Sequence, residues 1–60
     1  MEYEAELIND ANNNTDYRVE KITDDGGIEV AVFSGPDAAE RARTFARRYY
    51  GSFKDRSVSP

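Results

Sequence analysis

A four-residue turn signal in the middle of the chain constrains the fold more than any other feature. The segment 24–27 (DDGG) separates two short stretches rich in β-branched and aromatic residues, Tyr17–Thr23 and Ile28–Phe33. Glycine tolerates the positive φ that tight hairpin turns require, and such flanking stretches are typical of strands. The sequence therefore predicts a β-hairpin.

The register of this hairpin decides which side chains face the core. A turn centred on Asp25 and Gly26 pairs Thr23 with Ile28. The face that we expect to pack inward then holds Tyr17, Val19, Ile28, Val30 and Val32. The opposite face holds Arg18, Glu20, Ile22, Glu29, Ala31 and Phe33. Because side chains alternate along a strand, a shift of one residue would exchange the two faces.

Two further elements flank the hairpin. Met1–Ile8 alternates apolar and acidic residues with the period of a half-buried strand. After the hairpin, the segment 34–37 (SGPD) predicts a helix start, with Pro36 in the first turn and Ser34 or Gly35 as the cap. Alanine and aromatic residues then share one helical face, and Gly51 is a natural stop.

These elements predict an α+β domain of the order β-β-β-α. We expect a three-stranded antiparallel sheet with one helix packed on one face and the other face open to water or to a partner. The single domain is expected to span residues 1–53, with Phe53 folding back onto the core, and residues 54–60 are expected to form a flexible tail.

The composition argues against catalysis. The 60 residues include no cysteine and no histidine, which removes thiolate ligands, the usual zinc ligands and the usual general base. The acidic and amide residues of 10–16 resemble a calcium loop in spacing, but Thr15 stands where its glycine belongs. We therefore predict no enzyme, catalytic residue, metal or cofactor. The lack of a bilayer-length apolar run or signal peptide predicts a cytoplasmic protein.

The uneven distribution of charge suggests a binding surface. Residues 1–16 carry five acidic residues and no lysine or arginine, whereas residues 34–60 carry six basic and three acidic residues. A row of carboxylates on the open sheet face suits a protein partner with a basic surface, such as one that handles nucleic acid. The predicted partner-binding residues, with Phe33 as the apolar anchor, are Glu2, Glu4, Glu6, Glu20, Glu29 and Phe33.

Two other hypotheses stay open. In the first, the chain is a nucleic-acid-binding module that uses Arg43, Arg47, Arg48 and Lys54, although the pI of about 4.6 argues against this. In the second, it is a structural homodimer that hides the open sheet face or pairs its edge strands.

The junction between the last predicted strand and the helix adds a resemblance. The stretch 32–42 (VFSGPDAAERA), followed by Phe45-Ala46, resembles the strand-to-helix junction of small phage and prophage accessory proteins, over roughly residues 17–50. In size and charge the chain is similar to the anti-CRISPR proteins among them. The resemblance implies a small non-enzymatic inhibitor of a host protein, and it carries no site residue over.

Overall fold

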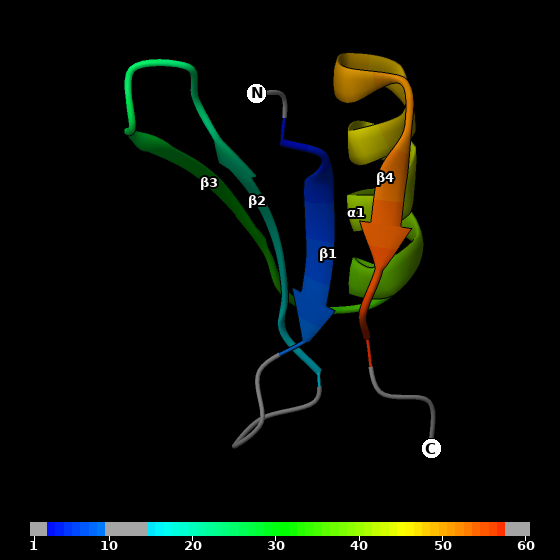
Figure 1. The fold of residues 1–60 in the computed structure, drawn as a ribbon. Helices are drawn as coiled ribbons and strands as arrows, with labels where there is room; N and C mark the ends of the chain where they lie inside the picture. The colour runs from blue at the N-terminus through cyan, green and yellow to red at the C-terminus, as the bar shows by residue number, and fades with distance from the viewer. Residues whose placement is uncertain (1–2, 10–14, 58–60) are drawn as a thin grey trace.

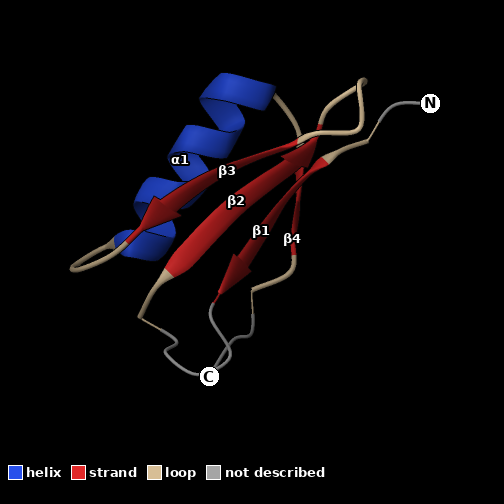
Figure 2. Cartoon of the chain, turned by 90° about the vertical axis from the view of Figure 1, so that its left-hand side faces the viewer, coloured by secondary structure: helices blue, strands red, loops and turns tan. Residues whose placement is uncertain are grey.

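The computed structural model describes residues 3–9 and 15–57, which form one helix and a single sheet (Figure 1). The strand order in the sheet is β3-β2-β1-β4. All four strands run side by side, and the helix lies across one face of the sheet (Figure 2). The elements are β1 (Ala5–Asn9), β2 (Tyr17–Ile22), β3 (Ile28–Phe33), α1 (Ala38–Tyr50) and β4 (Phe53–Asp55).

The sheet has one strand more than the sequence predicted, and it is mixed rather than antiparallel. After α1, the chain returns alongside β1, and β4 pairs with β1 in parallel. The amide of Arg56 continues this pairing by donating to the carbonyl of Leu7 at 2.8 Å. Lys54 and Asp55 therefore belong to the sheet rather than to a flexible tail. Phe53 packs against the core, as expected.

The turn between β2 and β3 shifts the predicted register by one residue. Thr23 donates its amide to the carbonyl of Gly27 at 2.8 Å, and Gly26 donates to the carbonyl of Thr23 at 3.0 Å. These bonds enclose a three-residue loop, residues 24–26. Its last residue, Gly26, has the left-handed φ of 89° that is typical of such loops. The loop is one residue longer than the two-residue turn that the prediction assumed. Ile22, not Thr23, therefore lies opposite Ile28.

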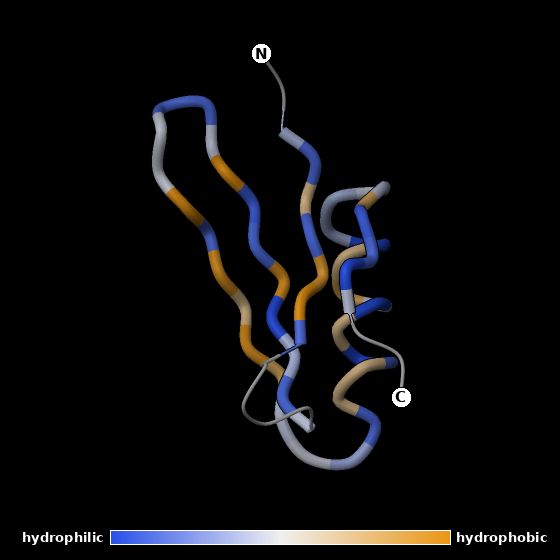
Figure 3. The backbone as a smooth tube through the Cα atoms, turned by 60° about the horizontal axis from the view of Figure 1, so that its bottom comes forward, coloured by the Kyte–Doolittle hydropathy of each residue, from blue (hydrophilic) through white to orange (hydrophobic). Residues whose placement is uncertain are grey.

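This shift exchanges the two faces of β3, so the predicted core was wrong for that strand. Ala31 and Phe33 face the helix, and Phe33 packs against the core cluster. The side chains expected inside instead lie in solvent, with exposed fractions of 65% for Ile28, 52% for Val30 and 62% for Val32. The hydropathy colouring of the backbone shows that apolar positions are concentrated along this strand (Figure 3).

The core is small and depends on close contact between α1 and the sheet. Its large fully buried side chains are Leu7 and Val19. Three alanines spaced one helical turn apart, Ala38, Ala42 and Ala46, are buried in α1. Because alanine has no side chain beyond Cβ, the helix backbone can approach the strands closely. Aromatic side chains fill the periphery of this contact, among them Tyr17, Phe33, Phe45, Tyr50 and Phe53.

The two ends of α1 differ in how well the sequence predicted them. Gly51 ends the helix as expected, with φ 88° and its amide bonded to the carbonyl of Arg47. At the start, however, Pro36 precedes the helix and neither Ser34 nor Gly35 caps it. The N-cap residue is Asp37, which has the left-handed φ of 61° and makes no side-chain cap hydrogen bond. The Arg41 side chain instead donates to the carbonyls of residues 34 and 36 and ties this junction to the helix.

Because α1 lies close to the sheet, we expect that replacing one of its buried alanines by a larger residue destabilises the fold. Ala42 is fully buried, so Ala42→Leu should lower the free energy of unfolding by about 1–3 kcal/mol, the usual cost of overpacking. Arg48→Leu is the matched control, since Arg48 is exposed on the same helix and such changes usually stay within about 0.5 kcal/mol. Urea unfolding followed by circular dichroism measures both, and equal stability of the two variants would contradict this account of the packing.

Candidate interaction surface

The sheet face opposite α1, called here the open face, carries a different chemistry on each strand. β3 contributes only β-branched side chains, from Ile28, Val30 and Val32. The strand pairings place three rows of side chains across this face. The first row holds Ile28 and Ile22, the second Val30, Glu20, Glu6 and Lys54, and the third Val32, Arg18 and Ile8.

One end of the open face is hollowed. A shallow depression of about 450 Å³ lies where the first and second rows meet. Glu4, Glu6 and Glu20 contribute three carboxylates to its lining, and Ile22 and Ile28 contribute apolar surface. The lining is completed by Tyr3 and Lys54. This depression, called here the acidic hollow, combines negative charge with an apolar wall, and that combination suits a basic side chain with an aliphatic stem.

Basic residues on the same face partly neutralise these carboxylates. Glu6 and Glu20 lie directly opposite each other on β1 and β2, a like-charge pairing that is destabilising by itself. Arg18 lies 3.5 Å from Glu20, and Arg56 lies 3.9 Å from Glu6. Both ion pairs are largely solvent-exposed, so each contributes little to stability. The arginines are thus held beside the hollow by weak interactions.

The structure brings together half of the predicted partner-binding residues. Glu4, Glu6 and Glu20 line the acidic hollow on the open face, the face on which the alternation of the first two strands placed them. Glu2 lies outside the described residues. Glu29 and Phe33 were placed on the wrong face, because the register shift turns both toward the helix.

Glu29 and Phe33 instead take part in an aromatic cluster beside α1. Phe33 packs on Phe45 with ring centroids 5.5 Å apart, and Phe45 stacks on Tyr49 at 5.2 Å. The Tyr50 hydroxyl donates a hydrogen bond of 2.9 Å to a carboxylate oxygen of Glu29. Burial, reinforced by this bond and by the Glu29 charge, raises the pKa of Tyr50 to about 12. Both residues thus have structural roles on the helix side of the sheet.

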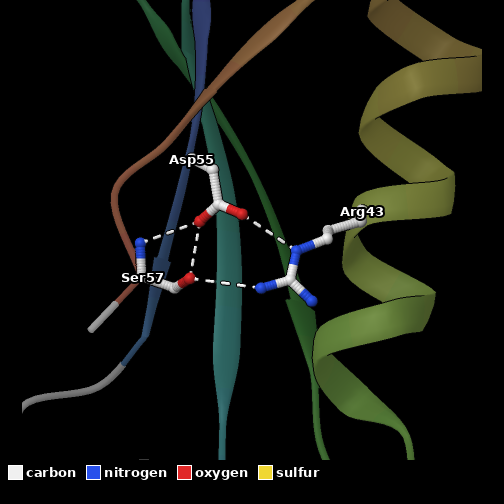
Figure 4. Close-up of polar contacts among 3 residues, drawn as sticks. All are labelled: Arg43, Asp55 and Ser57. Atoms are coloured by element: carbon white, nitrogen blue, oxygen red, sulfur yellow. Dashed lines mark hydrogen bonds and ion pairs between the residues drawn. The ribbon is translucent and has the colours of Figure 1, made fainter. Parts of the chain in front are cut away.

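The residues of the nucleic-acid hypothesis do not form one patch. Arg43 is engaged by β4 and the residues after it (Figure 4): its Nε lies 2.9 Å from Asp55, and its guanidinium donates to Ser57 at 3.4 Å. Lys54 lines the acidic hollow on the other side of the sheet. Arg47 and Arg48 are exposed near the end of α1. The four basic groups are therefore divided between two faces of the molecule.

The polar network of Asp55 also fastens β4 to the helix. Asp55 accepts hydrogen bonds from the amide of Ser57 at 3.0 Å and from its hydroxyl at 2.5 Å (Figure 4). The Ser57 hydroxyl bond is the main cause that holds the pKa of Asp55 below its ordinary value, and Arg43 adds to the effect. This network, together with the backbone pairing to β1, holds residues 54–57 beside the sheet.

Sequence reasoning missed the apolar part of the surface. Ile28, Val30 and Val32 were assigned to the core, although their alternation with Glu29 and Ala31 fits either face. The signal that distinguishes the faces is Phe33, whose large ring belongs inside more than any other side chain of that strand. Placing Phe33 inside puts all three β-branched residues on the open face.

Comparison with protein-family models, with curated proteins and with solved structures finds no match. The described residues contain no helix long and apolar enough to cross a membrane. Within residues 3–9 and 15–57, no cluster of three acidic, histidine or cysteine side chains is arranged to hold a metal ion.

The hydrogen bond between Tyr50 and Glu29 makes a testable prediction for alkaline pH. Because the pKa of Tyr50 in the folded chain, about 12, lies above the ordinary tyrosine value of 10.0, the neutral phenol stabilises the fold below pH 10.0. That contribution is lost as pH rises through the folded pKa. In an ultraviolet titration of the tyrosines, Tyr50→Phe should remove the step near pH 12. Glu29→Gln should move it to lower pH, because the repelling charge is gone.

Tyr3→Phe is the control for this titration, since Tyr3 is exposed and phenylalanine keeps a ring in the hollow that Tyr3 shares with Tyr50. This substitution should leave the step near pH 12 in place. If that step survives in Tyr50→Phe, the assignment to Tyr50 is wrong.

The Asp55 network makes a prediction for acid pH. The pKa of Asp55 in the folded chain is depressed below the ordinary aspartate value of 3.8, so the ionised carboxylate stabilises the fold above pH 3.8. This contribution is lost as pH falls through the folded pKa. Asp55→Asn should therefore be less stable than the wild type at neutral pH, and the difference should shrink below pH 3.8. Urea unfolding across pH measures this. Glu40→Gln, at an exposed position on α1, serves as the control, and a difference independent of pH would refute the role of the charge.

Proposed function

We propose that this chain is a small non-enzymatic protein-interaction module that binds its partner through the open face. One observation carries the proposal: the face opposite α1 joins four exposed β-branched side chains to a carboxylate-lined hollow. Soluble monomers seldom expose contiguous apolar side chains without a use for them, and such patches with a polar rim mark interaction sites. The exposed β-branched residues are Ile22, Ile28, Val30 and Val32.

The proposed partner is a protein with a basic side chain beside an apolar patch. The apolar part of its surface would cover β3, while a lysine or arginine would enter the acidic hollow and pair with Glu4 and Glu20. Charge complementarity of this kind sets orientation and association rate, whereas buried apolar contacts near the centre of an interface supply most of the affinity. The carboxylates of the acidic hollow favour a partner with a basic surface, such as a protein that handles nucleic acid. The role of a phage-type inhibitor, such as an anti-CRISPR protein, rests on the sequence resemblance and is part of the proposal.

A pair of matched variants tests this surface. Glu4→Lys combined with Glu20→Lys reverses the charge of the hollow, and Ile28→Asp places a charge in its apolar wall. Tagged wild type and variants are incubated with nuclease-treated bacterial lysate, and captured proteins are identified by mass spectrometry. Any captured protein is then purified, and its affinity is measured by calorimetry. Each variant should weaken binding by at least about tenfold, which corresponds to about 1.4 kcal/mol.

The control variant is Glu40→Lys, which makes the same kind of charge change on the exposed side of α1. Its affinity should stay within about twofold of wild type, since charges away from an interface contribute little. Equal loss of binding in Glu40→Lys would indicate attraction to net charge alone. Binding that survives both open-face variants would refute the proposed surface.

A further inference from the structure

The free edge of β3 is unprotected against pairing with another strand. Among the described strands, β3 is bonded only to β2, so its other edge carries unpaired amides and carbonyls. Proteins usually blunt such edges with lysine, proline, a bulge or a very short strand. The six residues of β3 (IEVAVF) contain no lysine or proline, and their pairing with β2 is uninterrupted. The one charged residue, Glu29, faces the helix and bonds to Tyr50.

The opposite edge of the sheet, formed by β4, is protected against pairing with another strand. β4 has only three residues and carries Lys54 and Asp55. It is followed at once by Arg56, which lies beside Glu6. One edge therefore has the usual protection, while the longer and more apolar edge lacks it.

The hairpin loop fixes which backbone groups point outward from β3. Thr23 donates to Gly27 across the hairpin. In an antiparallel pair, residues alternate between those that bond across and those that point away. Because Thr23 bonds across the hairpin, every second residue before it on β2 does so too. The partners of these residues on β3 are residues 29, 31 and 33, which therefore bond toward β2. The amides and carbonyls of Ile28, Val30 and Val32 therefore point to the free edge, while their side chains lie on the open face.

We propose that β3 pairs in antiparallel fashion with β3 of a second copy of this chain, about a two-fold axis at Val30. In this register, Val30 faces Val30 of the second copy, and Ile28 faces its Val32. All outward-pointing amides and carbonyls of the three residues then find partners. The two sheets join into one, and six β-branched side chains form a continuous strip on its open face.

The helix side of β3 accommodates the same register. Glu29 lies opposite the small Ala31 of the second copy, so the two Glu29 carboxylates are diagonal rather than directly opposed. A shallow hollow of about 270 Å³ lies beside this edge, lined in part by Phe45, Tyr49 and Tyr50. Tyr49 is 66% exposed. The second copy would cover part of this aromatic surface.

The size of the contact sets the expected affinity. β3 is about 20 Å long at ordinary strand rise, and the molecule is 16 Å along its shortest axis. A contact of these dimensions covers on the order of 300 Å² per copy, which lies below the standard interface of about 800 Å² per partner. The proposed dimer is therefore a weak one that forms as concentration rises. This inference goes beyond the proposed function, since it concerns the strand edge and not the open face.

Single cysteines test the register, because the chain has no cysteine of its own. Val30→Cys places the two thiols in a directly opposed pair with Cα atoms about 5.5 Å apart, within the range for a disulfide. Val32→Cys is the matched control, since its thiols would be displaced by four residues, about 13 Å along the strand. Both positions are exposed, so neither variant should perturb folding. In a glutathione buffer, Val30→Cys should form a disulfide dimer at least about tenfold faster, since pairing raises the effective thiol concentration.

The wild-type chain provides a second measurement that needs no variant. Sedimentation equilibrium and amide exchange by nuclear magnetic resonance are followed from about 20 μM to about 2 mM, a range that brackets weak association. The mass should rise toward that of a dimer, and exchange should slow at the amides of residues 28, 30 and 32. A monomer at every concentration, or equal cross-linking of the two cysteine variants, would overturn the proposal. So would protection of these amides only after a different protein is added.

Discussion

The three-residue loop that closes β2 and β3 is the constraint on which the rest of the structure depends. Its two backbone hydrogen bonds, between Thr23 and residues 26 and 27, set the pairing of every residue along the hairpin. Asp25 reinforces the loop by accepting hydrogen bonds from the Thr23 hydroxyl and the Gly27 amide. These bonds, with Thr23 as the main cause, hold the pKa of Asp25 below its ordinary value. A loop one residue shorter would turn β3 over and bury its β-branched side chains.

That choice of register also explains why the core is small. With Phe33 and Ala31 turned inward, the interior of β3 is filled by one ring and one methyl group, and α1 approaches on alanines. Domains of this length bury only about 60% of the surface that the unfolded chain exposes, so their stability is marginal. Here several large apolar side chains lie outside the core, and in the monomer only part of their surface is removed from water. A covering partner would therefore stabilise the fold as well as bind to it.

Local patterns predicted much of the fold, and the errors arise where a single residue of spacing matters. The alternation around Leu7 predicted its burial and the outward position of Glu4 and Glu6, and the glycine at position 51 predicted the end of α1. The loop length was not predictable from DDGG, because the same letters suit loops of two or three residues. β4 has too few residues to show a period. Its position depends on contacts with Arg43, which lies 12 residues before Asp55 and 14 residues before Ser57. The acidic part of the candidate surface followed from the alternation of residues 4–6 and of β2, whereas its apolar part on β3 required the register.

The same three residues of β3 serve both proposed contacts, through different groups. Their side chains belong to the open face, while their amides and carbonyls belong to the free edge. Pairing of two copies would leave the side chains uncovered and would double the apolar strip, with an acidic hollow at each end. A partner that spans this strip would bind the dimer better than the monomer, so partner binding and self-association would reinforce each other by mass action. A partner bound to the open face would then strengthen the weak dimer that forms through the free edge of β3.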